Sequence, residues 1–95
     1  MTTGASPAVM RRRFTILNER GLHARAAARF VAALDDFSAT VEVEKDGIRV
    51  SGRSIMGLMM LAAAIGTTIE VEAHGDDAGA ALDALAILVG NRFNE

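Results

Sequence analysis

Residues 21–29 read GLHARAAAR. A glycine and an apolar residue precede His23, and strong helix formers follow it, interrupted only by Arg25 and Arg29. This pattern predicts a helix that begins at or just after His23. The first backbone N–H groups of such a helix have no partner within the helix, so they can bind another group beside the imidazole.

The charges around this expected helix start are unusual. A helix N-terminus carries about half a positive charge, so first turns usually contain Asp or Glu. No carboxylate occurs between Glu19 and Asp35, although the chain has 12 acidic residues. We therefore expect an external anion, phosphate above all, to complete a site made of imidazole, guanidinium and free amides. The alternative is that His23 is only a cap or a solvated surface residue.

A second stretch without carboxylates, between Asp46 and Glu70, contains another expected helix start at Ser54. The last expected helix, in contrast, begins beside Asp76 and Asp77, where the dipole favours acids. This contrast favours one anion-binding face shared by the first two helix starts over two unrelated caps. Ser54 alone is an ordinary N-cap residue, whereas its phosphorylation would place a dianion at a helix N-terminus.

The 95 residues are 51% hydrophobic, which suits one small domain with a buried core. We expect this domain to span 10–95 and to follow a flexible arm at 1–9, which contains the only proline. The chain has no cysteine, and its two histidines are far apart in the sequence. We therefore expect no disulfide and no metal site.

Charge and hydropathy exclude two further classes of partner. The net charge of -2 and the aromatic content of 4% argue against a protein that binds nucleic acid. The longest apolar stretch, at 55–65, is too short to span a bilayer. No apolar segment of a secretory signal follows the arginines at 11–13. We expect no membrane insertion and a cytoplasmic location.

The periodicity of apolar residues predicts seven elements in the order β-α-β-β-α-β-α. Strands are expected at 10–17, 39–45, 48–51 and 67–73, and helices at 24–34, at 55–63 and from 76 or 77 to 89. Asp46-Gly47 is a strong hairpin signal, and Ile48 and Val50 are expected to point inward. The fold class is α+β: a four-stranded, mainly antiparallel sheet with helices on one face and water on the other.

Several residues at the element boundaries carry expectations of their own. Gly66 is expected to end the second helix, and His74 to lie in a turn. Residues 92–95 are expected to form a frayed tail. In the second helix we assign Leu58 and Leu61 to the core. The methionines beside them, Met56, Met59 and Met60, are either core filler or an adaptable surface for docking proteins.

Two segments resemble the HPr family, the histidine-containing phosphocarriers of the bacterial phosphoenolpyruvate-dependent phosphotransferase system. GLHARAA resembles the active-site motif, and RSIMGLMML resembles the second motif, around a regulatory serine. The distance between the motifs and the order of elements also match, over roughly residues 14–89. The resemblance implies an open-faced β-sandwich.

The resemblance also implies residue roles. His23 would accept a phosphoryl group on Nδ1 from phosphorylated enzyme I and pass it to enzyme IIA-type domains, in sugar uptake or a nitrogen-related branch. Arg25 would balance the phosphate charge, and a serine kinase/phosphorylase would act on Ser54. Successive partners would dock on an apolar surface formed by Ala24, Ala28, Ile55, Met56 and Met59. The protein would be a monomeric phosphoryl-transfer intermediate without a cofactor, not a free-standing enzyme.

One departure from the family pattern is Ala26, which stands where the motif usually has proline after the arginine. Alanine keeps the helix but loosens its start, since proline would fix φ there. Two alternative functions remain. One is a regulatory protein-interaction module controlled by phosphorylation of Ser54. The other is a small-molecule-sensing domain without a covalent step.

Overall fold

The computed structural model describes residues 9–95. The elements are β1 (Val9–Thr15), α1 (Ala24–Ala33), β2 (Thr40–Lys45), β3 (Ile48–Ser51), α2 (Ile55–Met60), β4 (Thr68–His74), α3 (Ala78–Gly90) and the short 3₁₀ helix η1 (Arg92–Asn94). The arm expected at 1–9 lies outside the described residues except for Val9, which begins β1. Within residues 9–95, no helix has the length and apolar character needed to cross a membrane.

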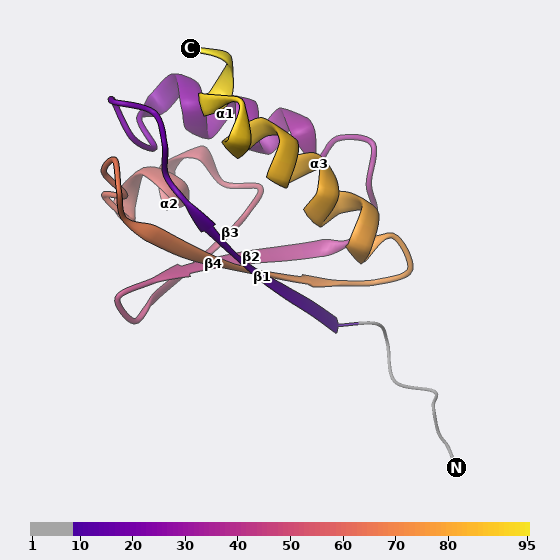
Figure 1. The fold of residues 1–95 in the computed structure, drawn as a ribbon. Coiled ribbons are helices and arrows are strands. Elements are labelled where there is room, and N and C mark those ends of the chain that lie inside the picture. The colour runs from indigo at the N-terminus through magenta and orange to yellow at the C-terminus, as the bar shows by residue number, and fades with distance from the viewer. Residues whose placement is uncertain (1–8) are drawn as a thin grey trace.

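The four strands form one sheet in the order β1-β4-β2-β3, and every neighbouring pair is antiparallel. Val71 in β4 lies opposite Arg12 of β1 on one side and opposite Val43 of β2 on the other. Figure 1 shows all three α-helices on one face of this sheet. The expected α+β class, an open-faced sandwich, is confirmed.

The core lies between the sheet and the helices. Alternate residues of β2 and β4 point inward, and Val43 and Val71 are fully buried. They meet large side chains from the helices, of which Phe30, Leu82 and Leu85 are also fully buried. Full burial of one such side chain stabilises a fold by roughly 1.5–3 kcal/mol.

Four expectations about residues at or near element boundaries were wrong. Ile48 is 46% exposed, because it begins the short edge strand β3 beside the hairpin turn. The helix α2 ends at Met60, and Ala62 beyond it has a positive φ of 50°. Gly66 is not the cap of α2, since its N–H donates to the carbonyl of Ile16. His74 lies within β4, where it pairs with residues of β1 and β2 instead of forming a turn.

The expectation of a frayed tail at 92–95 was also wrong. Arg92, Phe93 and Asn94 have φ values of 54°, 55° and 61°, so three consecutive residues are left-handed. Each such residue costs roughly 1–2 kcal/mol, so other interactions must hold the segment in place. The Phe93 side chain is fully buried, and Nη1 of Arg29 donates a hydrogen bond to its carbonyl. The segment is therefore part of the packed domain.

Replacing Phe93 with Ala tests this assignment. The change removes a fully buried aromatic side chain, so we expect the free energy of unfolding to fall by about 3–5 kcal/mol. Urea denaturation followed by circular dichroism measures it. The matched control is Ile87→Ala in α3, where the side chain is 66% exposed and the expected change is about 0.5 kcal/mol or less. Equal losses in the two variants would contradict the assignment.

Candidate functional site

The loop that precedes α1 is fixed against the segment that follows α2. The N–H of Leu22 donates to the carbonyl of Ala63 over 2.9 Å. At Gly21 φ is +65°, and a Cβ there would lie 2.3 Å from the same carbonyl oxygen. Only glycine avoids this clash and also adopts the positive φ readily. The glycine of the GLHARAAAR segment therefore sets where His23 is placed.

His23 is the N-cap residue of α1, as the sequence predicted. Its backbone is extended (φ -76°, ψ 179°), and its carbonyl accepts the N–H of Ala27 over 2.8 Å. Among residues 9–95, the N–H groups of Ala24, Arg25 and Ala26 find no hydrogen-bond acceptor. The first turn contains no acid, and the imidazole is 22% exposed. A partly accessible imidazole thus lies beside free helix amides, which is a favourable place for an anion.

A shallow hollow lies beside this imidazole. It has a volume of about 200 Å³, and its lining residues are Arg20, Leu22, His23, Ala62, Ala63 and Ala64. The hollow is formed by the loop before α1 and the segment after α2. The backbone there is held by the contact between Leu22 and Ala63.

The expectation that this site has no anion of its own was wrong. The carboxylate of Glu95, 72 residues away in sequence, contacts Nε2 of His23. Nδ2 of Asn18 donates to the other carboxylate oxygen over 3.3 Å and to the carbonyl of Gly21 over 2.7 Å. The hydrogen bond with His23, followed by that with Asn18, holds the pKa of Glu95 below its ordinary value. The sequence pattern missed Glu95 because the tail was expected to fray. The available signal was Phe93, since a large aromatic residue in the tail indicates that this segment packs against the core.

The two arginines of α1 differ in their surroundings. Arg25 is exposed and forms neither an ion pair nor a hydrogen bond with the described residues 9–95. Its guanidinium is therefore available to an incoming anion near His23. Arg29 instead donates to the carbonyl of Phe93, so it stabilises the C-terminal segment.

Ser54 caps α2, as predicted, and its Oγ accepts the N–H of Gly57 over 2.9 Å. The neighbouring Arg53 donates to carbonyls at and beyond the C-terminal end of α1, including those of Leu34 (3.0 Å) and Phe37 (2.8 Å). The start of α2 thus lies near the end of α1, while the segment after α2 contacts the start of α1. The expected face shared by both helix starts is wrong, because the two helices run in opposite directions.

The residues expected to form a docking surface are open to solvent to different degrees. Met56 is 74% exposed, Met59 is 42% exposed and Ile55 is 40% exposed. In α1, Ala24 is exposed and Ala28 is half-buried. The core positions of α2 are filled by Leu58 and Leu61, as predicted. The exposed methionines of this helix are therefore not core filler.

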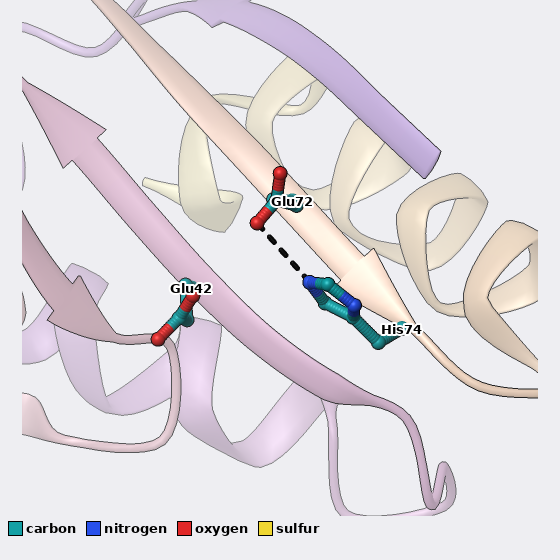
Figure 2. Close-up of side chains that lie close together, drawn as sticks. All are labelled: Glu42, Glu72 and His74. Carbon is teal, nitrogen blue, oxygen red and sulfur yellow. Dashed lines mark hydrogen bonds and ion pairs between the residues drawn. The ribbon is translucent and has the colours of Figure 1, made fainter. Parts of the chain in front are cut away.

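A cluster on the open face of the sheet was not predicted. Figure 2 shows Glu42, Glu72 and His74, whose potential ligand atoms lie within 4.8 Å of one another. Carboxylates and imidazole are suitable metal ligands. However, Glu72 bonds Arg11 (2.5 Å) and Arg49 (3.1 Å), and Arg49 also bonds Glu42 (2.6 Å). A cation would have to compete with both guanidinium groups. The sequence alone does not show the cluster, because it depends on the register between β2 and β4.

Most of the described chain resembles known phosphocarriers. It matches the family described as "PTS HPr component phosphorylation site" over residues 10–91. It is 45% identical to a phosphocarrier protein HPr of Cupriavidus necator, with 92% of this chain and 98% of that one covered. It is 40% identical to a phosphocarrier protein NPr of Shewanella violacea, with 90% and 94% covered. The crystal structure of HPr-C-His from Thermoanaerobacter tengcongensis matches with a TM-score of 0.86 and 41% identity, covering 90% and 97%.

Replacing Ser54 measures its role as a cap. Ser54→Ala removes the acceptor for the N–H of Gly57, and we expect a loss of about 1 kcal/mol in the free energy of unfolding. Ser54→Asp keeps an acceptor at the N-cap and should remain close to wild type. Urea denaturation of both variants measures the difference. Equal destabilisation by alanine and aspartate would mean that the cap bond does not stabilise the domain.

Glu72 should make stability depend on pH. Hydrogen bonds from Arg11, His74 and Arg49 lower its pKa from 4.5 to about 2. The ionised form therefore stabilises the fold above pH 4.5, and this contribution is lost as the pH falls towards 2. Glu72→Gln should be less stable than wild type at neutral pH and should lose less stability across that acidic window. Urea midpoints at a series of pH values test this. Arg49→Met should flatten only part of the same window, because the hydrogen bonds from Arg11 and His74 remain. Parallel curves for Glu72→Gln and wild type would contradict it.

Proposed function

This chain belongs to the HPr family of phosphocarriers of the phosphotransferase system, and on that premise we propose that His23 carries the phosphoryl group. It would accept the group on Nδ1 from phosphorylated enzyme I and pass it to enzyme IIA-type domains. The observation that carries this proposal is the partly exposed imidazole at the start of α1, beside free amides and with no acid in the first turn. The other histidine, His74, lies on the opposite side of the sheet among carboxylates.

The chemistry needs few groups from this chain. A neutral imidazole is available as a nucleophile near neutral pH. Phosphoryl transfer depends mainly on positioning and on neutralising charge. The amides of α1 and the guanidinium of Arg25, which has no partner among residues 9–95, would supply both. The hollow beside His23 is shallow, so a bound phosphoryl group stays accessible to the next acceptor. The partner proteins would contribute the remaining catalytic groups.

Successive partners would dock on the surface around the two helices. Ala24 and Ala28 of α1 and Ile55, Met56 and Met59 of α2 are the proposed contact residues. Methionine suits this task because its flexible, polarisable side chain adapts to different partner surfaces. We propose that the carrier acts as a monomer in the cytoplasm. Sugar uptake and a nitrogen-related branch are the two candidate roles, and the similarity to a phosphocarrier protein NPr supports the second.

Ser54 would be a regulatory site in a cell that contains a suitable kinase. Its hydroxyl caps α2 immediately before Ile55 and Met56. A phosphoryl group there would add about two negative charges beside this proposed docking surface, which disfavours apolar contacts. The alternative function, a regulatory interaction module controlled at Ser54, would need no phosphoryl transfer through His23.

Incubation with phosphoenolpyruvate and enzyme I separates the two functions. We expect one acid-labile, base-stable phosphoryl group on the wild-type protein and none on His23→Ala, because the acceptor nitrogen is gone. His74→Ala is the matched control and should be labelled as the wild type is. Mass spectrometry and ³¹P NMR identify the adduct. A phosphoryl group on His23→Ala, or an unlabelled His74→Ala protein, would refute the assignment. If His23→Ala binds its partners normally and Ser54→Asp does not, the alternative is favoured.

A further inference from the structure

We propose that Glu42, Glu72 and His74 bind a divalent transition-metal ion, with Zn²⁺ as the reference ion, on the open face of the sheet. The set combines one imidazole with two carboxylates, and their potential ligand atoms lie within 4.8 Å of one another (Figure 2). Zinc sites with three protein ligands use such mixtures and leave the fourth position to water. The expectation of no metal site rested on two distant histidines, whereas this set needs only one of them.

The antiparallel register brings the three ligands together. Glu42 of β2 lies directly opposite Glu72 of β4, and His74 follows two residues later on the same face. Like charges directly opposite each other destabilise a sheet, so this pairing is unfavourable without a cation. The next pair on this face, Glu44 and Glu70, repeats the arrangement. The two central strands thus present carboxylates to one another along the open face.

The observed distances are close to those of a metal site. Nε2 of His74 lies 3.1 Å from Oε1 of Glu72. Two ligand atoms of a tetrahedral Zn²⁺ ion lie about 3.3–3.4 Å apart, since each is about 2.0–2.1 Å from the metal. These two atoms would therefore need to move very little. The third ligand, Glu42, is half-buried, and a rotation of its side chain can complete the set.

A positive group from the edge strand already bridges the two carboxylates. Nη1 of Arg49 donates to Oε1 of Glu42 over 2.6 Å and to Oε1 of Glu72 over 3.1 Å. These oxygens are the proposed metal ligands, so Arg49 is the direct competitor. Its side chain is 42% exposed, and its Nη2 also contacts Glu44 at 3.4 Å. Arg49 can therefore leave the site and still keep a carboxylate partner.

Arg11 contacts a different oxygen and would support the metal site. Its Nε bonds Oε2 of Glu72 over 2.5 Å, so a metal bound through Oε1 alone leaves this bond in place. Carboxylates that bind metals are usually held by such an additional hydrogen bond. The bonds from Arg11, His74 and Arg49 together lower the pKa of Glu72 to about 2, so this ligand is ionised at neutral pH.

A metal here would connect β2 with β4 on the side of the sheet away from the helices. An ion that binds only the folded chain raises the midpoint of thermal unfolding. Imidazole favours Zn²⁺ and its neighbours in the periodic table, whereas Mg²⁺ prefers an octahedron of oxygen ligands. We therefore expect stabilisation by Zn²⁺ and none by Mg²⁺. The proposed site is separate from His23 and does not rest on phosphoryl transfer.

Titration of the full chain with ZnCl₂ tests the site, with calorimetry for the affinity and imidazole ¹⁵N NMR to identify the histidine. We expect the His74 resonances to shift in the wild type and MgCl₂ to leave them unchanged. Glu72→Gln should weaken binding, and His74→Ala should lower the affinity at this site at least about tenfold. Arg49→Met should bind Zn²⁺ more tightly than the wild type, because the competing guanidinium is gone.

The matched control is His23→Ala, since His23 and Glu95 form the other contact between a histidine and a carboxylate among residues 9–95. It should leave the His74 shifts and the associated affinity unchanged. Circular dichroism without metal checks that each variant is folded.

Three results would overturn the proposal. The first is that millimolar Zn²⁺ leaves the His74 resonances of the wild type in place. The second is that His74→Ala binds as the wild type does while His23→Ala does not. The third is that Arg49→Met binds more weakly than the wild type, which would mean that Arg49 helps to build the site and does not compete for it.

Discussion

The close backbone contact between the loop before α1 and the segment after α2 determines the geometry of the site. The hydrogen bond from Leu22 to Ala63 joins these two segments, and the absence of a side chain at Gly21 allows the approach. Because of this contact, α1 begins immediately beside the surface formed by α2, and His23 is held at the junction. A helix start elsewhere in the fold would offer the same amides without neighbouring apolar side chains. The site therefore depends on packing between helices as much as on its charged groups.

The fold was largely predictable from the sequence because its periodicities are regular. Alternation in β2 and β4, the Asp46-Gly47 hairpin and the helix start after His23 are local signals, and each of them appears in the structure. Local signals do not report the direction in which two helices pack. The absence of acids near both His23 and Ser54 therefore suggested one shared face, whereas the two helix starts lie at opposite ends of the α1–α2 pair.

The largest error concerned the last four residues. Their composition is polar apart from Phe93, and α3 has already ended at Gly90. Three consecutive residues with positive φ are locally unfavourable, so no propensity argument predicts that conformation. It exists because burial of Phe93 and the bond from Arg29 compensate for it. Tertiary packing here overrides local preference and brings Glu95, which the sequence left unassigned, into contact with His23.

The order of the strands has a consequence for how the molecule meets copies of itself. Sheets with bare outer strands tend to extend by pairing edge to edge, which leads to aggregation. Here one outer strand, β1, contains three consecutive arginines, and the other, β3, has only four residues. Like charges and a short pairing length both oppose strand addition between molecules. A carrier that works by repeated collision can thus be abundant without its exposed sheet becoming a template for fibres.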